Sequence, residues 1–426
     1  MKRRCRHDWT PARRLFPPPA GAAGRPSVSK GIGVCSRLTL PGRVQTRRRR
    51  YEQPGLGSVS PLDAAIDLAG KAVSLGVREL ACRLSLDAAS FARAGECLLK
   101  ASGLRLGDET FRKLVESEGK AVIAAQDAEQ LEFDWRASDC RVAQADGRVV
   151  TRLYLGCDGV MVPTVTAGEK HKRRVKALAR RKRLKRRLRG RGQPRGPLPA
   201  MRAGTTERFK EMKLVGFYDQ EREHRLVRAT RKGPKHAGRL MRQGMTGLLI
   251  GGADQRIALV DGAPWIARQI RHRRPAFDPL TLDFWHLSEH VHQARRELFG
   301  ESDPAGVAWA EQLLSAIRHQ GYEPFWQKLI ERRSRTRSPR RRKALDGLMH
   351  YVAERRTMLD YPRHERQGWD IGSGPTESMC KTLTRRVKGS GKRWDADNAE
   401  AMIALEGLLQ SDQWSGWWDH RLQQAA

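Results

Sequence analysis

The chain has 426 residues, of which 39% are hydrophobic and 30% are charged, a composition typical of a globular protein with more than one domain. Lysine and arginine number 82 against 47 aspartate and glutamate, a formal net charge of +35. This excess indicates a polyanionic partner, nucleic acid before a membrane surface, and no apolar run approaches the roughly 20 residues that span a bilayer.

The seven cysteines are scattered singly, with no C-x-x-C pair. This spacing favours reduced thiols in a cytoplasmic protein, and it argues against a disulfide framework and against a zinc ribbon. The positively charged N-terminus, MKRRCRHDW, is not followed by the apolar segment of a signal peptide. We therefore expect a cytoplasmic protein that is not exported and has no membrane partner.

Two regions precede the first predicted strand of the main sheet. Residues 1–57 are rich in Arg, Pro and Gly and predict a disordered basic tail, which either contacts DNA or is simply solvated. Residues 58–145 have apolar residues at helical spacing and predict a small all-α domain, in which Asp108 caps a helix that Gly119 closes. A turn at residues 103–107 allows a DNA-reading helix-turn-helix, with a plain helical domain as the alternative.

The stretch Arg152–Pro163, RLYLGCDGVMVP, predicts a largely buried strand that carries one carboxylate, Asp158. Burying a lone carboxylate costs several kcal/mol, so it must be paired, hydrogen-bonded or metal-bound. Two further strands, a helix and a fourth strand follow, and this order places the first strand beside the fourth in one mixed sheet. The fourth strand ends at Asp261, so we expect Asp158 and Asp261 to be neighbours in a metal site, although each Asp-Gly pair alone is more typical of a turn.

A basic insertion at residues 168–206 follows the first strand of the predicted sheet, and no acidic residue lies between Glu169 and Glu207. Charge runs are usually solvated, but this density favours an arm that is disordered or loosely helical alone and binds DNA phosphates. The residues expected to make these contacts are Lys170, Arg173, Arg174, Arg180, Arg181, Lys182, Arg183, Lys185, Arg186 and Arg187.

A helix predicted after the next strand contains the sequence HLSEH. It fits the zinc-peptidase pattern H-x-x-E-H, in which His286 and His290 bind zinc and Glu289 is the base. The sequence places no third zinc ligand, and a charge of +35 is unusual for a peptidase. Zinc hydrolysis is kept as an alternative.

Helical spacing continues over residues 301–366, which predict a helical insertion. Residues 367–410 form the last predicted region, before a tail at 411–426. Within that region a Gly-Pro cluster precedes a helix whose first turn holds Glu377, either an acid favoured by the helix dipole or a third functional carboxylate. The cations that follow and are expected to hold DNA phosphates are Lys381, Arg385, Lys388, Lys392 and Arg393.

Five segments resemble the motifs of a known family: CDGVMVP, ALVDGAPWI, LDFWH, YPRHERQGWDIGSGPTES and VKGSGKRW. They look like bacterial insertion-sequence transposases of the DDE type, in the ISKra-type group, which is similar to the Mutator-like transposases. The resemblance runs from Arg49 to Leu409, and the ordered set of motifs is its specific feature. It implies an α/β RNase H-like catalytic domain at 146–300, a mixed five-stranded sheet with flanking helices, with a helical insertion before the last catalytic helix.

The resemblance places the catalytic and metal-binding triad on Asp158, Asp261 and Glu377, with Asp283 and His286 as supporting residues. Two Mg²⁺ ions, replaceable by Mn²⁺, are the cofactors that phosphodiester chemistry and oxygen ligands favour. The implied reaction cleaves double-stranded DNA at insertion-sequence ends and transfers the freed 3′-hydroxyl to target DNA, in a homodimer or larger assembly at the bacterial nucleoid.

The chain departs from the family at residues 52–57, where such proteins often carry paired cysteines and this sequence has none. The resemblance therefore does not extend to a zinc-bound DNA-reading module. A catalytically inactive DNA-binding protein derived from a transposase is the alternative to an active enzyme.

Overall fold

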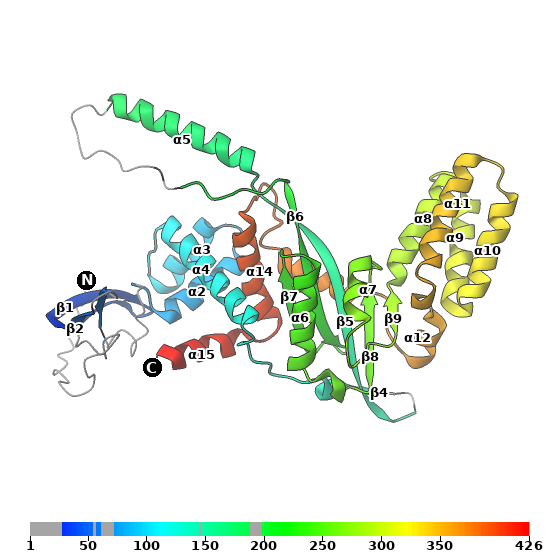
Figure 1. The fold of residues 1–426 in the computed structure, drawn as a ribbon, viewed down its shortest axis with the longest axis horizontal. Helices are drawn as coiled ribbons and strands as arrows, with labels where there is room; N and C mark the ends of the chain where they lie inside the picture. Colours follow the sequence, from blue (N-terminus) through cyan, green and yellow to red (C-terminus); the bar gives the residue numbers. More distant parts are fainter. Residues whose placement is uncertain are drawn as a thin grey trace. The chain divides into compact units, whose positions relative to one another are not determined.

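The computed structural model of the chain describes residues 28–53, 57–60, 72–144, 146–187, 198 and 200–425. The chain divides into two compact units, one formed by residues 1–118 and 415–426 and the other by residues 119–414 (Figure 1). The division falls inside helix α4 (Asp108–Asp127). No helix in the described ranges is both long and apolar enough to cross a lipid bilayer.

The first unit contains a small antiparallel sheet in the order β1-β2-β3. Its strands are β1 (Val28–Thr39), β2 (Gly42–Gln53) and β3 (Gly57–Val59). The sequence predicted a disordered tail through residue 57, and these strands correct that prediction at residues 28–53 and at residue 57. Two paired strands satisfy each other's backbone groups even where the side chains are a run of arginines, which a search for hydrophobic periodicity does not detect. Residues 1–27 lie outside the described residues.

Helices form the rest of the first unit. They are α2 (Leu75–Asp87), α3 (Phe91–Ser102), the first half of α4, and α15 (Trp414–Ala425). The last of these corrects the prediction of a tail at 411–426. Its residues Trp417 and Trp418 are buried, and Arg421 forms an ion pair with the buried Glu118, so the segment packs as part of the unit.

A mixed sheet in the order β7-β6-β5-β8-β9 organises the second unit (Figure 1). Its strands are β5 (Val149–Pro163), β6 (Phe209–Asp219), β7 (Arg225–Thr230), β8 (Gln255–Val260) and β9 (Leu280–Leu282), and the short β4 (Arg141–Ala143) also pairs with β5. The first three strands of the order are antiparallel, whereas β5, β8 and β9 are parallel. The predicted α/β class and the adjacency of the first and fourth strands are confirmed.

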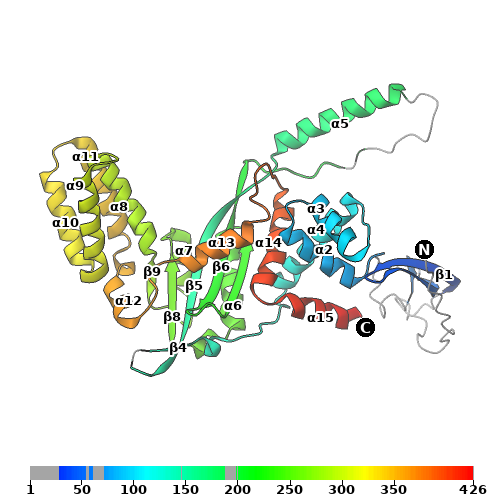
Figure 2. The same ribbon diagram turned by 180° about the vertical axis from the view of Figure 1, so that it is seen from behind.

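Helices cover both faces of this sheet. On one face, α6 (Pro234–Gly247) and α7 (Pro264–Ile270) share a hydrophobic core with the alternate residues Leu153, Leu155 and Cys157 of β5. On the other, α13 (Gly374–Thr384) and α14 (Ala396–Gln410) lie against β5, β6 and β7 (Figure 2). The apolar side predicted for the helix after Glu377 is buried there, at Met379 and Leu383.

A bundle of helices between β9 and α13 extends the same hydrophobic core. Its main members are α8 (Phe284–Phe299), α9 (Pro304–Ser315), α10 (Tyr322–Arg335), α11 (Pro339–Ala353) and α12 (Tyr361–Gln367), with a π-helical turn at Ala316–Gln320. Helices α9 and α11 both pack on α8. The region predicted as a helical insertion, 301–366, is therefore helical.

Gly119 does not close a helix as the sequence predicted, because α4 continues through it to Asp127. A Cβ atom at this position would lie 2.2 Å from the carbonyl oxygen of Ala401 in α14. The residue is thus a site of close helix contact, which propensity rules cannot separate from a helix stop.

We predict that Gly119→Ala lowers the free energy of unfolding by about 1–3 kcal/mol, the usual cost of overpacking, although alanine favours helix. Gly347→Ala is the matched control, because Gly347 lies on the exposed side of α11 with open space around its Cα. That variant should be more stable by about 0.5–1 kcal/mol. Chemical denaturation measures both, and equal effects of the two substitutions would contradict the close contact.

Candidate active site

Three aspartates follow the paired ends of the three parallel strands. The register aligns Cys157 of β5 with Val260 of β8, and Val260 with Leu282 of β9. Asp158, Asp261 and Asp283 are the next residues in each case. Since neighbouring strands lie about 4.8 Å apart, the sheet brings the first two carboxylates together as predicted. Cys157 and Val260 point into the core, so Asp158 and Asp261 point to the opposite face.

Asp158 is half-buried, and each of its carboxylate oxygens accepts one hydrogen bond. Its Oδ1 accepts a hydrogen bond from the Gly159 amide at 2.5 Å, and its Oδ2 accepts one from the Cys380 thiol of α13 at 3.2 Å. Burial and the charge of Asp158 both raise the pKa of Cys380. The thiol is therefore a neutral donor to the carboxylate at physiological pH.

Asp261 is half-buried, and its Oδ1 accepts a hydrogen bond from the Ala263 amide at 2.8 Å. Burial raises the pKa of this carboxyl group, and the negative charge of Asp158 raises it further, whereas His286 and Arg355 oppose the shift. The two carboxylates therefore repel each other. A cation between them would relieve that repulsion and favour the ionised form of both.

Glu377 is exposed in the first turn of α13, on a helix that is tightly fixed to the sheet. A Cβ atom at Gly156 of β5 would lie 1.9 Å from Thr376 Oγ1, so only glycine lets this helix approach. Glu377 and Cys380 are three residues apart and share a side of the helix. Helix α13 thus carries Glu377 on the same side as its contact with Asp158.

The three predicted ligands do not form a closed cluster. Among the described residues, one group of at least three possible ligands has all its ligand atoms within 4.8 Å of one another, and it is Asp219, Glu223 and His224. This group lies in the turn between β6 and β7, where Asp219 accepts a hydrogen bond from the His224 amide at 3.0 Å. This hydrogen bond within the turn explains the aspartate at position 219 without a metal ion.

Asp283 is buried and joins two elements of the site. Its Oδ1 accepts from the Trp285 amide at 3.0 Å and caps α8, and its Oδ2 accepts from Ser373 Oγ at 2.5 Å. A backbone bond from the Phe284 amide to the Ile371 carbonyl, 2.9 Å, lies beside them. Asp283 therefore fastens the loop that precedes α13 to the end of β9.

His286, Glu289 and His290 occupy the first turns of α8 without a gathered ligand set. His286 Nδ1 lies 3.9 Å from Glu289 Oε2, and the His290 ring stacks on Tyr351 with centroids 3.7 Å apart. In the described part of the chain these residues belong to no group of three ligand atoms within 4.8 Å. His286 acts instead on Asp261, whose pKa its charge lowers.

Sequence reasoning missed Arg355, which comes from the helical insertion. Its Nη2 donates to the Gly262 carbonyl at 3.0 Å, and its guanidinium lies over the Tyr351 ring at 4.1 Å. Its positive charge lowers the pKa of Asp261. Arg355 sits in an arginine-rich region, so no sequence signal separates it from its neighbours; Cys380 could have been found from its helical spacing to Glu377.

Most of the predicted phosphate-binding cations are accessible. The basic insertion forms α5 (Ala167–Arg187), a regular helix where a disordered or loosely helical arm was expected. Lys170 at its start pairs with Asp395 at 2.7 Å, Arg393 pairs with Glu169, and Lys392 donates to the Arg386 carbonyl at 3.1 Å. The exposed members are Arg173, Arg180, Lys182, Arg183, Lys381, Arg385, Lys388 and Arg393. The half-buried members are Lys170, Arg174, Arg181 and Lys392, and the side chains of Lys185, Arg186 and Arg187 lie outside the described part.

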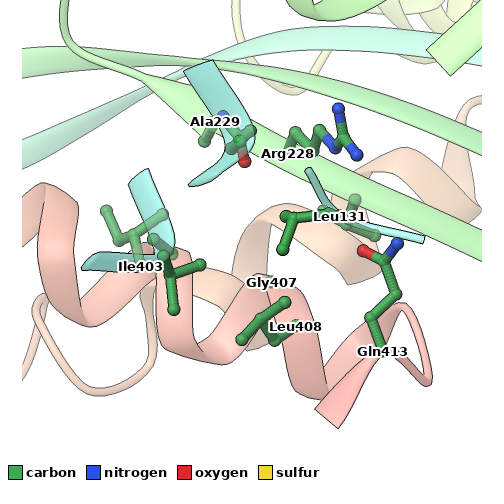
Figure 3. Close-up of a pocket in the computed structure, with 11 residues that line it drawn as sticks. Leu131, Arg228, Ala229, Ile403, Gly407, Leu408 and Gln413 are labelled. Atoms are coloured by element: carbon green, nitrogen blue, oxygen red, sulfur yellow. The ribbon is translucent and has the colours of Figure 1, made fainter. Parts of the chain in front are cut away.

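A separate small pocket lies between α14 and β7 (Figure 3). Leu131, Ile403 and Leu408 line it together with Arg228 and Gln413. None of its lining residues is among the predicted site residues. No protein-family model and no curated protein matches the chain.

The Asp283–Ser373 bond should be worth a measurable coupling energy. Asp283→Ala removes a helix cap, about 1 kcal/mol, and leaves the Ser373 hydroxyl unpaired, a further 1–3 kcal/mol or so. We expect the double variant with Ser373→Ala to be less destabilised than the sum of the two single variants, by about 0.5–3 kcal/mol. Denaturant unfolding gives the values, and Ser334→Ala at the exposed end of α10 is the control. Additive effects would contradict the bond.

Because burial and Asp158 disfavour the ionised form of Asp261, we predict that Asp261→Asn stabilises the folded state, by an amount that depends on pH. The folded pKa lies above the unfolded value of about 3.9, so ionisation weakens the folded state progressively as pH rises from about 4. In metal-free buffer the variant should have a higher thermal midpoint than the wild type at pH 7, because asparagine keeps the acceptor for the Ala263 amide. The difference should vanish below pH 4, and a lower midpoint at pH 7 would contradict the cause given.

Proposed function

We propose that the chain is a DNA transposase of the DDE type, which cleaves double-stranded DNA at insertion-sequence ends and joins the freed 3′ end to target DNA. The observation that carries the proposal is the pairing of β5 with β8, which sets Asp158 beside Asp261 on the face that α13 covers. Three antiparallel strands followed by two parallel ones fit the RNase H-like domain that the sequence resemblance implies.

Asp158, Asp261 and Glu377 are the residues that would hold divalent metal ions. Their oxygen ligands suit Mg²⁺ or Mn²⁺, and the raised pKa of Asp261 supports a site designed for added positive charge. When bound, two such ions supply an activated oxygen nucleophile and neutralise charge on the leaving oxygen of a phosphodiester. Glu377, the least constrained of the three, has to approach the pair from the first turn of α13.

The remaining residues of the site bind and orient. Asp283, through Ser373, fixes the start of α13 and hence the position of Glu377. Arg355 holds the turn after Asp261 through the Gly262 carbonyl. Exposed cations on α5 and on and after α13 are suited to DNA phosphates, and such contacts supply affinity rather than sequence choice.

A DNA-binding protein without catalytic activity is the second candidate. One observation favours it: the ligand atoms of Asp158, Asp261 and Glu377 do not all lie within 4.8 Å of one another in the described structure. The same cations serve binding in either case, so only a cleavage assay separates the two functions.

The test is nicking of a DNA duplex that carries the inverted repeats flanking the coding sequence. We expect Mg²⁺-dependent nicking by the wild type and a loss in Asp158→Asn and Glu377→Gln that exceeds the 10–100-fold or so typical of supporting residues, with duplex binding retained. Glu289→Gln is the matched control, since Glu289 matters only to zinc hydrolysis. Nicking that survives in both triad variants would refute the proposal, and binding without nicking at any divalent ion would favour the second candidate.

A further inference from the structure

The hairpin of β1 and β2 presents to solvent one face that carries basic, polar and aliphatic side chains. Directly opposite residues of antiparallel strands share a face, and the register pairs Ile32 with Arg49, Val34 with Arg47 and Ser36 with Gln45. We call these six residues the ribbon face. The neighbouring register positions, such as Arg37, which is buried, belong to the opposite side of the hairpin.

The ribbon face carries no negative charge, and five of its six residues are exposed; Ser36 is half-buried and accepts a hydrogen bond from Arg43 at 3.3 Å. Gln45, Arg47 and Arg49 are exposed, and the side chains of Ile32 and Val34 are 64% and 65% exposed. The charge complements a polyanion, and the mixture of groups offers more than phosphate contact.

We propose that the ribbon face enters the major groove of double-stranded DNA and contacts base edges. The inference deepens the proposed function and rests on it, since it takes DNA to be the substrate. A two-stranded β-ribbon has the width that the major groove of B-form DNA admits.

The chemistry of the five exposed residues matches base edges. Arginine bonds the O6 and N7 atoms of guanine, glutamine bonds the N6 and N7 atoms of adenine, and apolar side chains contact the thymine methyl group. Gln45, Arg47 and Arg49 alternate along β2, so they are spaced by about 7 Å, close to the rise of two base pairs. The ribbon face can therefore read positions two base pairs apart along one strand.

The same geometry selects DNA over RNA. The major groove of an A-form RNA duplex is deep and narrow, and side chains cannot read it. A protein partner would need a larger buried apolar surface than the two aliphatic side chains of this face provide. B-form DNA is therefore the occupant that fits both the charge and the width.

The experiment is a selection from randomised 30-base-pair DNA duplexes with the full chain. The wild type should enrich guanine at positions two base pairs apart, and the Arg47→Ala, Arg49→Ala double variant should lose that preference and bind the enriched duplex about tenfold or more weakly per arginine removed. Methylation of guanine N7 by dimethyl sulfate should be blocked at those positions by the wild type alone.

A control variant of equal charge change is Arg173→Ala with Arg180→Ala in α5. The number of phosphate contacts, obtained from the slope of binding affinity against salt concentration, should fall by about two in this variant. The enriched sequence should stay unchanged. The ribbon inference fails if the ribbon variant enriches the same bases as the wild type, if the wild type enriches none, or if an RNA duplex of the enriched sequence binds equally well. Because binding is measured without cleavage, these outcomes are independent of the nicking assay, whose failure would bear on the proposed function alone.

Discussion

Parallel pairing of β5 with β8 is the constraint on which the candidate site depends. It joins residues about a hundred positions apart and makes Asp158 and Asp261 neighbours on one face. The intervening chain, β6, β7 and α6, is what allows a parallel neighbour at all, because parallel strands need a long crossover. Without this register, Asp158 would be a lone carboxylate within β5, and Asp261 an ordinary residue of an Asp-Gly turn.

The third carboxylate depends on a different set of contacts, since α13 follows β9 only after the long helical insertion. Arg152 of β5 is fully buried, and its guanidinium donates to the Gly368 carbonyl at 2.8 Å and to the Gln367 carbonyl at 3.1 Å. Tyr154 accepts from the Asp370 amide at 3.1 Å, and Asp283 accepts from Ser373. These bonds return the chain to the sheet just before Glu377. They explain why a polar segment rather than an apolar one precedes the helix.

Hydrophobic periodicity predicted the strands of the main sheet and their order, because buried strands need alternating or continuous apolar residues. It did not predict β1 and β2, whose stability comes from backbone pairing beneath exposed arginines. Asp158, Asp261 and Glu377 were also predicted as site residues, because each is a carboxylate within or beside an apolar strand or at the start of a helix. Arg355 and Ser373 were not, because their roles come from contacts with residues more than 80 positions away, which no local pattern records.

The charges of the candidate site favour the divalent ions of the proposed function. The chain is strongly basic, yet at the center of the second unit it sets two carboxylates side by side, and burial and their repulsion raise the pKa of Asp261. DNA phosphates that the surrounding cations attract would be repelled by this pair. A divalent cation, as proposed, would remove both conflicts, since it would neutralise the carboxylates and bind phosphate oxygen. Arg355 and His286 lower the pKa of Asp261, but burial and the charge of Asp158 outweigh them and the pKa stays raised, so the proposed metal ions would find charge left to balance.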